Sequence, residues 1–95
     1  MEFILSRTSV WDYKYEDKTD EEIIDLLELP KEKFDIQIKE FTAQSGIKNR
    51  LPVIKINSLE DLIRLKVIIN KEIIITDNIT SSEYLEIEIY DDYRE

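Results

Sequence analysis

The chain has 95 residues, enough for one modest hydrophobic core, and we predict a single domain over residues 1–95. Its hydrophobic content of 42% is typical of a folded protein rather than of a disordered acidic chain. The sequence contains no Cys and no His, which excludes disulfides, Cys/His metal sites, a Cys–His dyad and a Ser–His–Asp triad.

The formal charge of −9 comes from 22 acidic and 13 basic residues. Direct binding to nucleic acid is therefore disfavoured, because such proteins gain affinity by neutralising phosphates. An acidic surface suits a basic partner or serves solubility alone. No stretch has the length of a membrane span or the pattern of a signal peptide, so we expect a cytoplasmic protein without membrane association.

The first element predicted along the chain is a strand over residues 2–10, which begins strongly apolar and then becomes polar. Trp11, Tyr13 and Tyr15 follow at alternate positions. We expect these three aromatic side chains to pack in the core. The alternative is an aromatic patch that binds a partner.

A helix is predicted over roughly residues 20–29. Thr19 and Glu22 have the spacing of a capping box, and three acids occupy the first turn. Apolar residues then recur at helical spacing, and Pro30 disfavours helical geometry at the residue before it.

Two strands are predicted next, over residues 34–42 and 51–56, because apolar and polar residues alternate in both. The connection between them contains Gly46, the only glycine, and predicts a hairpin. Lys48 and Arg50 lie in that loop, residues 44–50, and we expect them to face solvent.

The next helix is predicted to begin after Ser58, a capping residue, and to end at Asn70, which tolerates left-handed geometry. Its apolar side comprises Leu59, Leu62, Ile63, Leu65 and Ile69. Three isoleucines at 73–75 then predict a strand near the sheet centre, covered on both faces. The strand at 53–56, this helix and the strand at 73–76 together predict a βαβ unit with a parallel, right-handed strand pair.

A polar turn is predicted over residues 77–82 and a final strand over 84–90. In that strand Leu85, Ile87 and Ile89 face the core, whereas Glu86 and Glu88 share the opposite face. We expect it to lie at the sheet edge, where charges prevent further pairing. The predicted fold is an α+β domain with a mixed sheet of four to five strands and two helices packed against it.

Acidic residues form the candidate functional sites. The first group, Glu21, Asp25 and Glu28, is expected on one side of the first helix, where like charges at such spacings cost stability. The second group comprises Glu86, Glu88, Asp91 and Asp92 in the last strand and at its tip. Each group is either a solvated surface or a surface that binds a basic partner.

Enzymatic chemistry is not predicted. The sequence offers no nucleophile elbow, phosphate-binding loop or dinucleotide fingerprint. Asp91 and Asp92 have oxygen ligands suited to Mg²⁺ or Ca²⁺, but a site needs several converging groups and adjacent acids on a strand diverge. We therefore expect no catalytic residues, no metal and no cofactor; tight binding of Mg²⁺ or Mn²⁺ would instead favour a carboxylate-metal enzyme.

The stretches FILSRTSVWD, VIKINSLEDLIRL with EIIIT, and LEIEIYDDYRE are similar to parts of small proteins from Firmicutes phages and prophages. Residues 15–49 share no such resemblance. The resemblance implies a mobile element, in which small acidic proteins act as anti-defence factors, including anti-CRISPR proteins, in the host bacterial cytoplasm.

The leading hypothesis is a non-enzymatic inhibitor, monomeric or dimeric, that binds a basic, nucleic-acid-binding defence complex through acidic surface. Such a surface can occupy a basic channel and mimic nucleic acid. The alternative is a structural or regulatory phage module that self-associates or acts as an adaptor, in which the Tyr and Trp residues matter more than the acids.

Overall fold

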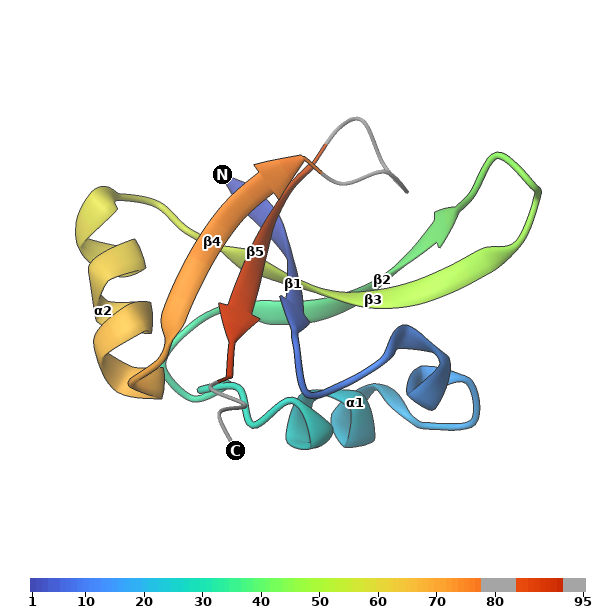
Figure 1. Cartoon of the computed structure of the whole chain (residues 1–95), viewed down its shortest axis with the longest axis horizontal. Helices are drawn as coiled ribbons and strands as arrows, with labels where there is room; N and C mark the ends of the chain where they lie inside the picture. The colour runs from blue at the N-terminus through green and yellow to red at the C-terminus, as the bar shows by residue number, and fades with distance from the viewer. Residues whose placement is uncertain (78–83, 92–95) are drawn as a thin grey trace.

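The computed structural model describes residues 1–77 and 84–91 (Figure 1). Five strands form one mixed sheet in the order β2-β3-β1-β5-β4, with β1 and β5 parallel and the other neighbours antiparallel. The predicted α+β class is confirmed. In chain order the elements are β1 (Glu2–Arg7), the 3-10 helix η1 (Asp12–Tyr15), α1 (Asp20–Leu26), β2 (Ile36–Thr42), β3 (Lys48–Lys55), α2 (Leu59–Ile69), β4 (Glu72–Asp77) and β5 (Leu85–Tyr90).

Helix α1 begins at the predicted capping box. The Thr19 hydroxyl accepts a hydrogen bond from the Glu22 backbone N–H, and the Glu22 carboxylate accepts one from the Thr19 N–H at 2.8 Å. The helix ends at Leu26, three residues earlier than predicted. Glu28 lies beyond it with a φ of 55°, so its predicted place on the helix side with Glu21 and Asp25 is wrong.

Helix α2 confirms both predicted ends. The Ser58 hydroxyl accepts a hydrogen bond from the Asp61 N–H, and Asn70 is left-handed with a φ of 52°. Leu65 is fully buried, and Leu62 and Ile69 are partly buried. Leu59 and Ile63, which were predicted on the same apolar side of the helix, are instead exposed.

The strand order corrects three predictions. Strands β3 and β4 are not paired, because β1 and β5 lie between them. Strand β4 lies at the edge rather than in the centre, and its Ile74 and Ile75 are each 42% exposed. Strand β5 is interior rather than an edge strand, since it pairs with β1 on one side and β4 on the other. The acids of β5 therefore do not protect a sheet edge.

The hairpin between β2 and β3 is shorter than predicted. Strand β3 begins at Lys48, so Lys48 and Arg50 belong to the strand rather than to the loop. Arg50 does not face solvent freely: its guanidinium donates to Asp20 at 2.9 Å and to the backbone oxygens of Tyr15 and Lys18. It therefore ties the sheet to the segment that leads into α1.

One face of the sheet forms the main core with the helices. Alternation along the strands places Leu5, Ile54, Ile87 and Ile89 on this face. To the same buried cluster α1 contributes Ile23 and Ile24, the residue just after α1 contributes Leu27, and α2 contributes Leu65. The predicted inward orientation of Ile87 and Ile89 is confirmed, because both are fully buried.

The opposite face of the sheet is concave. The Tyr84 ring, just before β5, lies edge-on to the Phe41 ring of β2, with centroids 5.4 Å apart. These segments touch although β3 and β1 separate β2 from β5 in the sheet, so the sheet curls toward this face. Ile4 and Val53 are buried on this face.

Candidate functional site

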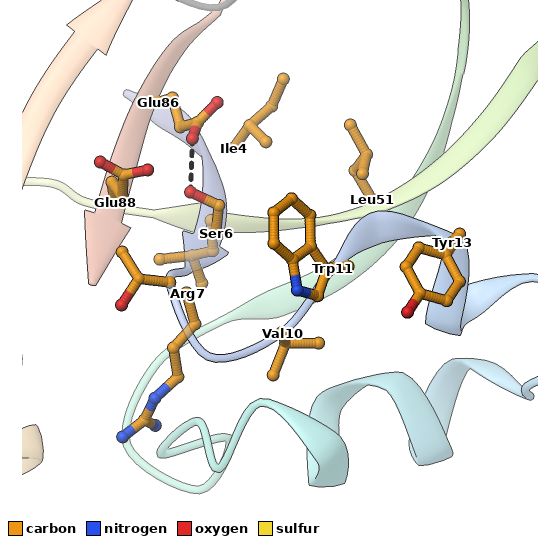
Figure 2. Close-up of a pocket in the computed structure, with 11 residues that line it drawn as sticks. Ile4, Ser6, Arg7, Val10, Trp11, Tyr13, Leu51, Glu86 and Glu88 are labelled. Atoms are coloured by element: carbon orange, nitrogen blue, oxygen red, sulfur yellow. Dashed lines mark hydrogen bonds between the residues drawn. The ribbon is translucent and has the colours of Figure 1, made fainter. Parts of the chain in front are cut away.

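The concave face contains a hollow of about 490 Å³ beside the ends of β1 and β5 (Figure 2). Ile4 of β1 and Leu51 of β3 supply apolar surface, and the segment after β1 supplies Val10, Trp11 and Tyr13. Glu86 and Glu88 of β5 supply carboxylates. The hollow thus combines an apolar surface, aromatic rings and negative charge.

Strand register explains why the two carboxylates and Ser6 are neighbours. Ile4 pairs with Glu86 and Ser6 pairs with Glu88 in the parallel β1–β5 ladder, so all four side chains share one face. The Ser6 hydroxyl donates a hydrogen bond to the Glu86 carboxylate, as Figure 2 shows. The shared face predicted for Glu86 and Glu88 is therefore confirmed.

Glu88 differs from Glu86 in its contacts. It is half-buried, and no other residue in the ranges 1–77 and 84–91 makes a hydrogen bond or ion pair with its carboxylate. Its cross-strand neighbours are Ser6 and Ile74, neither of which is basic. Its negative charge is therefore not neutralised by these neighbours.

Trp11 and Tyr13 are exposed, contrary to the expected core packing. The exposed fractions are 66% for Trp11 and 70% for Tyr13, whereas Tyr15 is buried as predicted. Helix η1 causes this difference, because its tight turn replaces the alternation of an extended strand and turns Tyr15 alone into the core. In Figure 2 the Trp11 ring projects into the hollow between the β5 carboxylates and Leu51.

A second hollow, of about 360 Å³, continues the surface beyond Tyr13. Tyr13 and Leu51 line both hollows, and the second also includes Ile47, which is exposed at the β2–β3 turn. Trp11, Tyr13 and Ile47 form an exposed apolar ridge. Large exposed side chains grouped beside hollows are typical of interaction surfaces.

Arg7 also borders the first hollow, but its guanidinium points away from Glu86 and Glu88 (Figure 2). It donates to the Asp91 carboxylate at 2.9–3.1 Å and to the Leu27 carbonyl oxygen at 2.8 Å. The Arg7 and Asp91 side chains are only 10% and 13% exposed. The Arg7 guanidinium, which belongs to a residue that borders the hollow, is therefore bound to Asp91 and Leu27 rather than to Glu86 or Glu88.

Asp91, predicted as a partner-binding residue, takes part in this internal ion pair. Hydrogen bonds from Arg7 lower the pKa of the Asp91 carboxyl to about 2; burial opposes that shift, and hydrogen bonds from Ser9 add to it. The Asp91 backbone N–H also donates to the Thr8 hydroxyl at 2.9 Å. Asp91 thus joins the end of β5 to β1, and Arg7 extends this connection to the residue that follows α1.

Of the α1 candidates, Glu21 and Asp25 are exposed, and neither lines the hollow. Lys31 donates a hydrogen bond to Asp25 at 2.9 Å, and its Nζ lies 3.9 Å from a Glu21 carboxylate oxygen. This pairing raises the pKa of Lys31, chiefly through the hydrogen bond to Asp25. Part of the predicted acidic surface is therefore already neutralised.

The candidate acids do not form one continuous set. Glu86 and Glu88 meet in the hollow, whereas Glu21 and Asp25 lie apart on α1 and Glu28 lies past its end. Asp92 and most of the predicted turn at 77–82 lie outside the described residues. Across the described ranges, no group of three or more acids is arranged to hold a metal ion. Within those ranges, neither helix has the length and apolar character to cross a membrane.

Sequence reasoning missed Ser6 and Trp11 as members of the same site as Glu88. Ser6 interrupts the apolar run of β1, which is the only sequence signal for a polar position on that face. Trp11 follows a turn rather than continuing the strand, and nothing in the local pattern gives its orientation. Comparisons with protein-family models, curated proteins and solved structures found no match to this chain.

Proposed function

We propose that the chain is a non-enzymatic inhibitor that binds the basic surface of a nucleic-acid-binding host defence complex. The observation that carries the proposal is the hollow, where two carboxylates lie beside an exposed Trp and Tyr. Aromatic residues are enriched at the centres of protein interfaces, and acidic groups beside them select a basic partner.

The net charge of −9 supports the same partner class. It accelerates the encounter with a basic protein and disfavours approach to nucleic acid itself. The defence complex as target, the phage or prophage origin and the host bacterial cytoplasm rest on the resemblance of the three sequence stretches. An inhibitor of this kind competes with DNA for a basic channel.

The test measures DNA binding by a purified CRISPR effector nuclease with increasing amounts of the chain. We expect the wild-type chain to reduce DNA binding at near-stoichiometric amounts and to lose potency as salt is raised. If no effector or other defence nuclease is bound or inhibited, the proposed function is wrong.

Two matched variants locate the binding surface. Glu88→Lys and Glu21→Lys change the net charge equally, so long-range attraction to a basic partner falls equally in both. We expect Glu88→Lys to reduce inhibition about tenfold or more, because it also places a like charge in the interface. Inhibition lost only in Glu21→Lys would assign binding to the α1 surface and refute the role of the hollow.

A second candidate function, self-association in a structural or regulatory phage module, is favoured by a separate feature. Leu59, Ile63 and Val67 follow one another at four-residue spacing on α2, and all three are more than half exposed. The adjacent edge strand β4 exposes Ile74 and Ile75 as well. Dimers in sedimentation that are insensitive to salt and lost in Val67→Lys would support this function over the inhibitor.

A further inference from the structure

We infer that the first hollow is a binding site for a guanidinium group, presented by an arginine in an extended segment of the basic partner. This inference deepens the proposed function and rests on it for the identity of the partner. The binding chemistry itself belongs to the isolated chain and is measured without the partner.

Charge selects a cation. Glu86 and Glu88 line the hollow, and the one basic residue that borders it among the described positions, Arg7, directs its guanidinium to Asp91 and Leu27. The Glu88 carboxylate makes no hydrogen bond or ion pair with the other described residues, so an incoming N–H donor does not have to displace a protein group there. Because the Glu88 carboxylate is half-buried, a charge-assisted hydrogen bond to it is stronger than one to a fully solvated carboxylate.

The aromatic rings select guanidinium over ammonium. Trp11 projects into the hollow on the side facing the carboxylates (Figure 2), and most of its surface is open to a ligand. Guanidinium is planar and weakly hydrated, so one face can stack on the indole while its N–H groups, which lie in the guanidinium plane, donate to carboxylate oxygens at its edge. An ammonium group is more strongly hydrated and cannot combine both contacts equally well.

The size and surroundings of the hollow suit a side chain within a peptide. Its volume of about 490 Å³ exceeds that of a metal ion and accommodates one long side chain with part of its backbone. The apolar surface of Ile4 and Leu51 matches the methylene groups of arginine. The ridge formed by Trp11, Tyr13 and Ile47 continues to the second hollow, which gives the flanking residues of an extended segment a surface to contact.

The test uses the blocked peptide acetyl-Gly-Arg-Gly-amide and two counterparts. The citrulline peptide keeps the shape of arginine but lacks the charge, and the lysine peptide keeps the charge but carries an ammonium group. Trp11 is the only tryptophan in the chain, so its fluorescence reports on this hollow directly. We expect the arginine peptide to bind at millimolar strength, about tenfold more tightly than the citrulline peptide and several-fold more tightly than the lysine peptide. Amide resonances of Ser6, Trp11 and Glu88 should shift together during the titration.

Glu88→Gln and Glu60→Gln provide a matched pair. Each removes one negative charge, but Glu60 lies exposed on α2 and does not line the hollow. We expect Glu88→Gln to weaken arginine-peptide binding about tenfold and Glu60→Gln to change it less than twofold. Circular dichroism checks that both variants are folded.

Three outcomes would overturn the inference: equal binding of the arginine and citrulline peptides, equal effects of the two variants, or resonance shifts confined to α1. Tighter binding of spermidine than of the arginine peptide at the same residues would also overturn it, because the site would then select a flexible polyamine. If arginine binds as expected but no defence complex is inhibited, the site stands and the proposed function fails.

Discussion

Replacing Asp91 with Asn tests the role of the Arg7–Asp91 ion pair in stability. The pKa of Asp91 falls from 3.8 to about 2 in the folded protein, chiefly because Arg7 donates hydrogen bonds to it. At about 1.4 kcal/mol for each tenfold change in proton affinity, this difference corresponds to roughly 2–3 kcal/mol of stability near neutral pH. For a chain of this size the loss lowers Tm by roughly 10–20 °C.

The sign of the pH dependence follows from the direction of the pKa shift. Because the folded-state pKa is depressed, the unfolded chain binds the proton first as pH falls, and protonation therefore favours unfolding. The contribution of Asp91 is fully present above about pH 4.5, falls to about half near pH 3 and is nearly lost near pH 2. The stability difference between wild type and Asp91→Asn should shrink over the same interval.

Urea denaturation followed by circular dichroism at several pH values measures this difference. The control is Asp25→Asn, which removes an ion pair of the same 2.9 Å length between more exposed side chains, Lys31 at 39% and Asp25 at 65%. We expect the control to change the free energy of unfolding by less than about 0.5 kcal/mol. Equal losses in both variants near pH 7, or a loss in Asp91→Asn that persists near pH 2, would refute the assignment of the stabilisation to this ion pair.

Two further substitutions test the packing and the helix end. Leu65→Ala should lower the free energy of unfolding by about 2–5 kcal/mol, because Leu65 is fully buried. Leu59→Ala, at an exposed position of the same helix, should change it by less than about 0.5 kcal/mol. Similar losses for the two variants in urea denaturation would contradict the orientation of α2. Glu28→Gly should raise the free energy of unfolding by about 0.5–1 kcal/mol, because glycine adopts the observed left-handed φ of 55° without side-chain strain. A loss of stability in Glu28→Gly would show that Glu28 has another structural role.

The local elements were largely predictable because their signals lie within a few residues. The capping box at Thr19 and Glu22, the cap at Ser58 and the left-handed Asn70 are short-range patterns, and the structure confirms each. The end of α1 was not predicted, because Pro30 marks only the last residue that a helix can reach. Asn70 was recognisable as a left-handed residue, whereas Glu28 takes the same geometry without a side chain that favours it.

Strand order was not predictable, because it depends on which segments pair at long range. Three consecutive isoleucines in β4 and the alternating acids of β5 predicted a central and an edge strand respectively, and the structure reverses the two positions. The reversal follows from two sets of pairings. Strand β3 has β2 on one edge and β1 on the other, which excludes a β3–β4 pair, and β1 takes β5 as its parallel neighbour, which leaves β4 to pair with the outer edge of β5. The local sequence indicates which residues of a strand are buried, but it contains no information on which strands lie beside one another in the sheet.

The site illustrates the same division between local and long-range information. Period-two alternation was sufficient to place Glu86 and Glu88 on one face of β5. Whether that face is flat or hollow depends on the curl that brings Tyr84 to Phe41, and the position of Trp11 depends on the turn after β1. Because β5 lies inside the sheet, its acids have paired strands on both sides and do not have the role of protecting an edge. Glu86 and Glu88 were expected on an edge strand, where their charges would only aid solubility. Because β5 instead lies inside the sheet and lines the hollow, the two carboxylates form a candidate binding site.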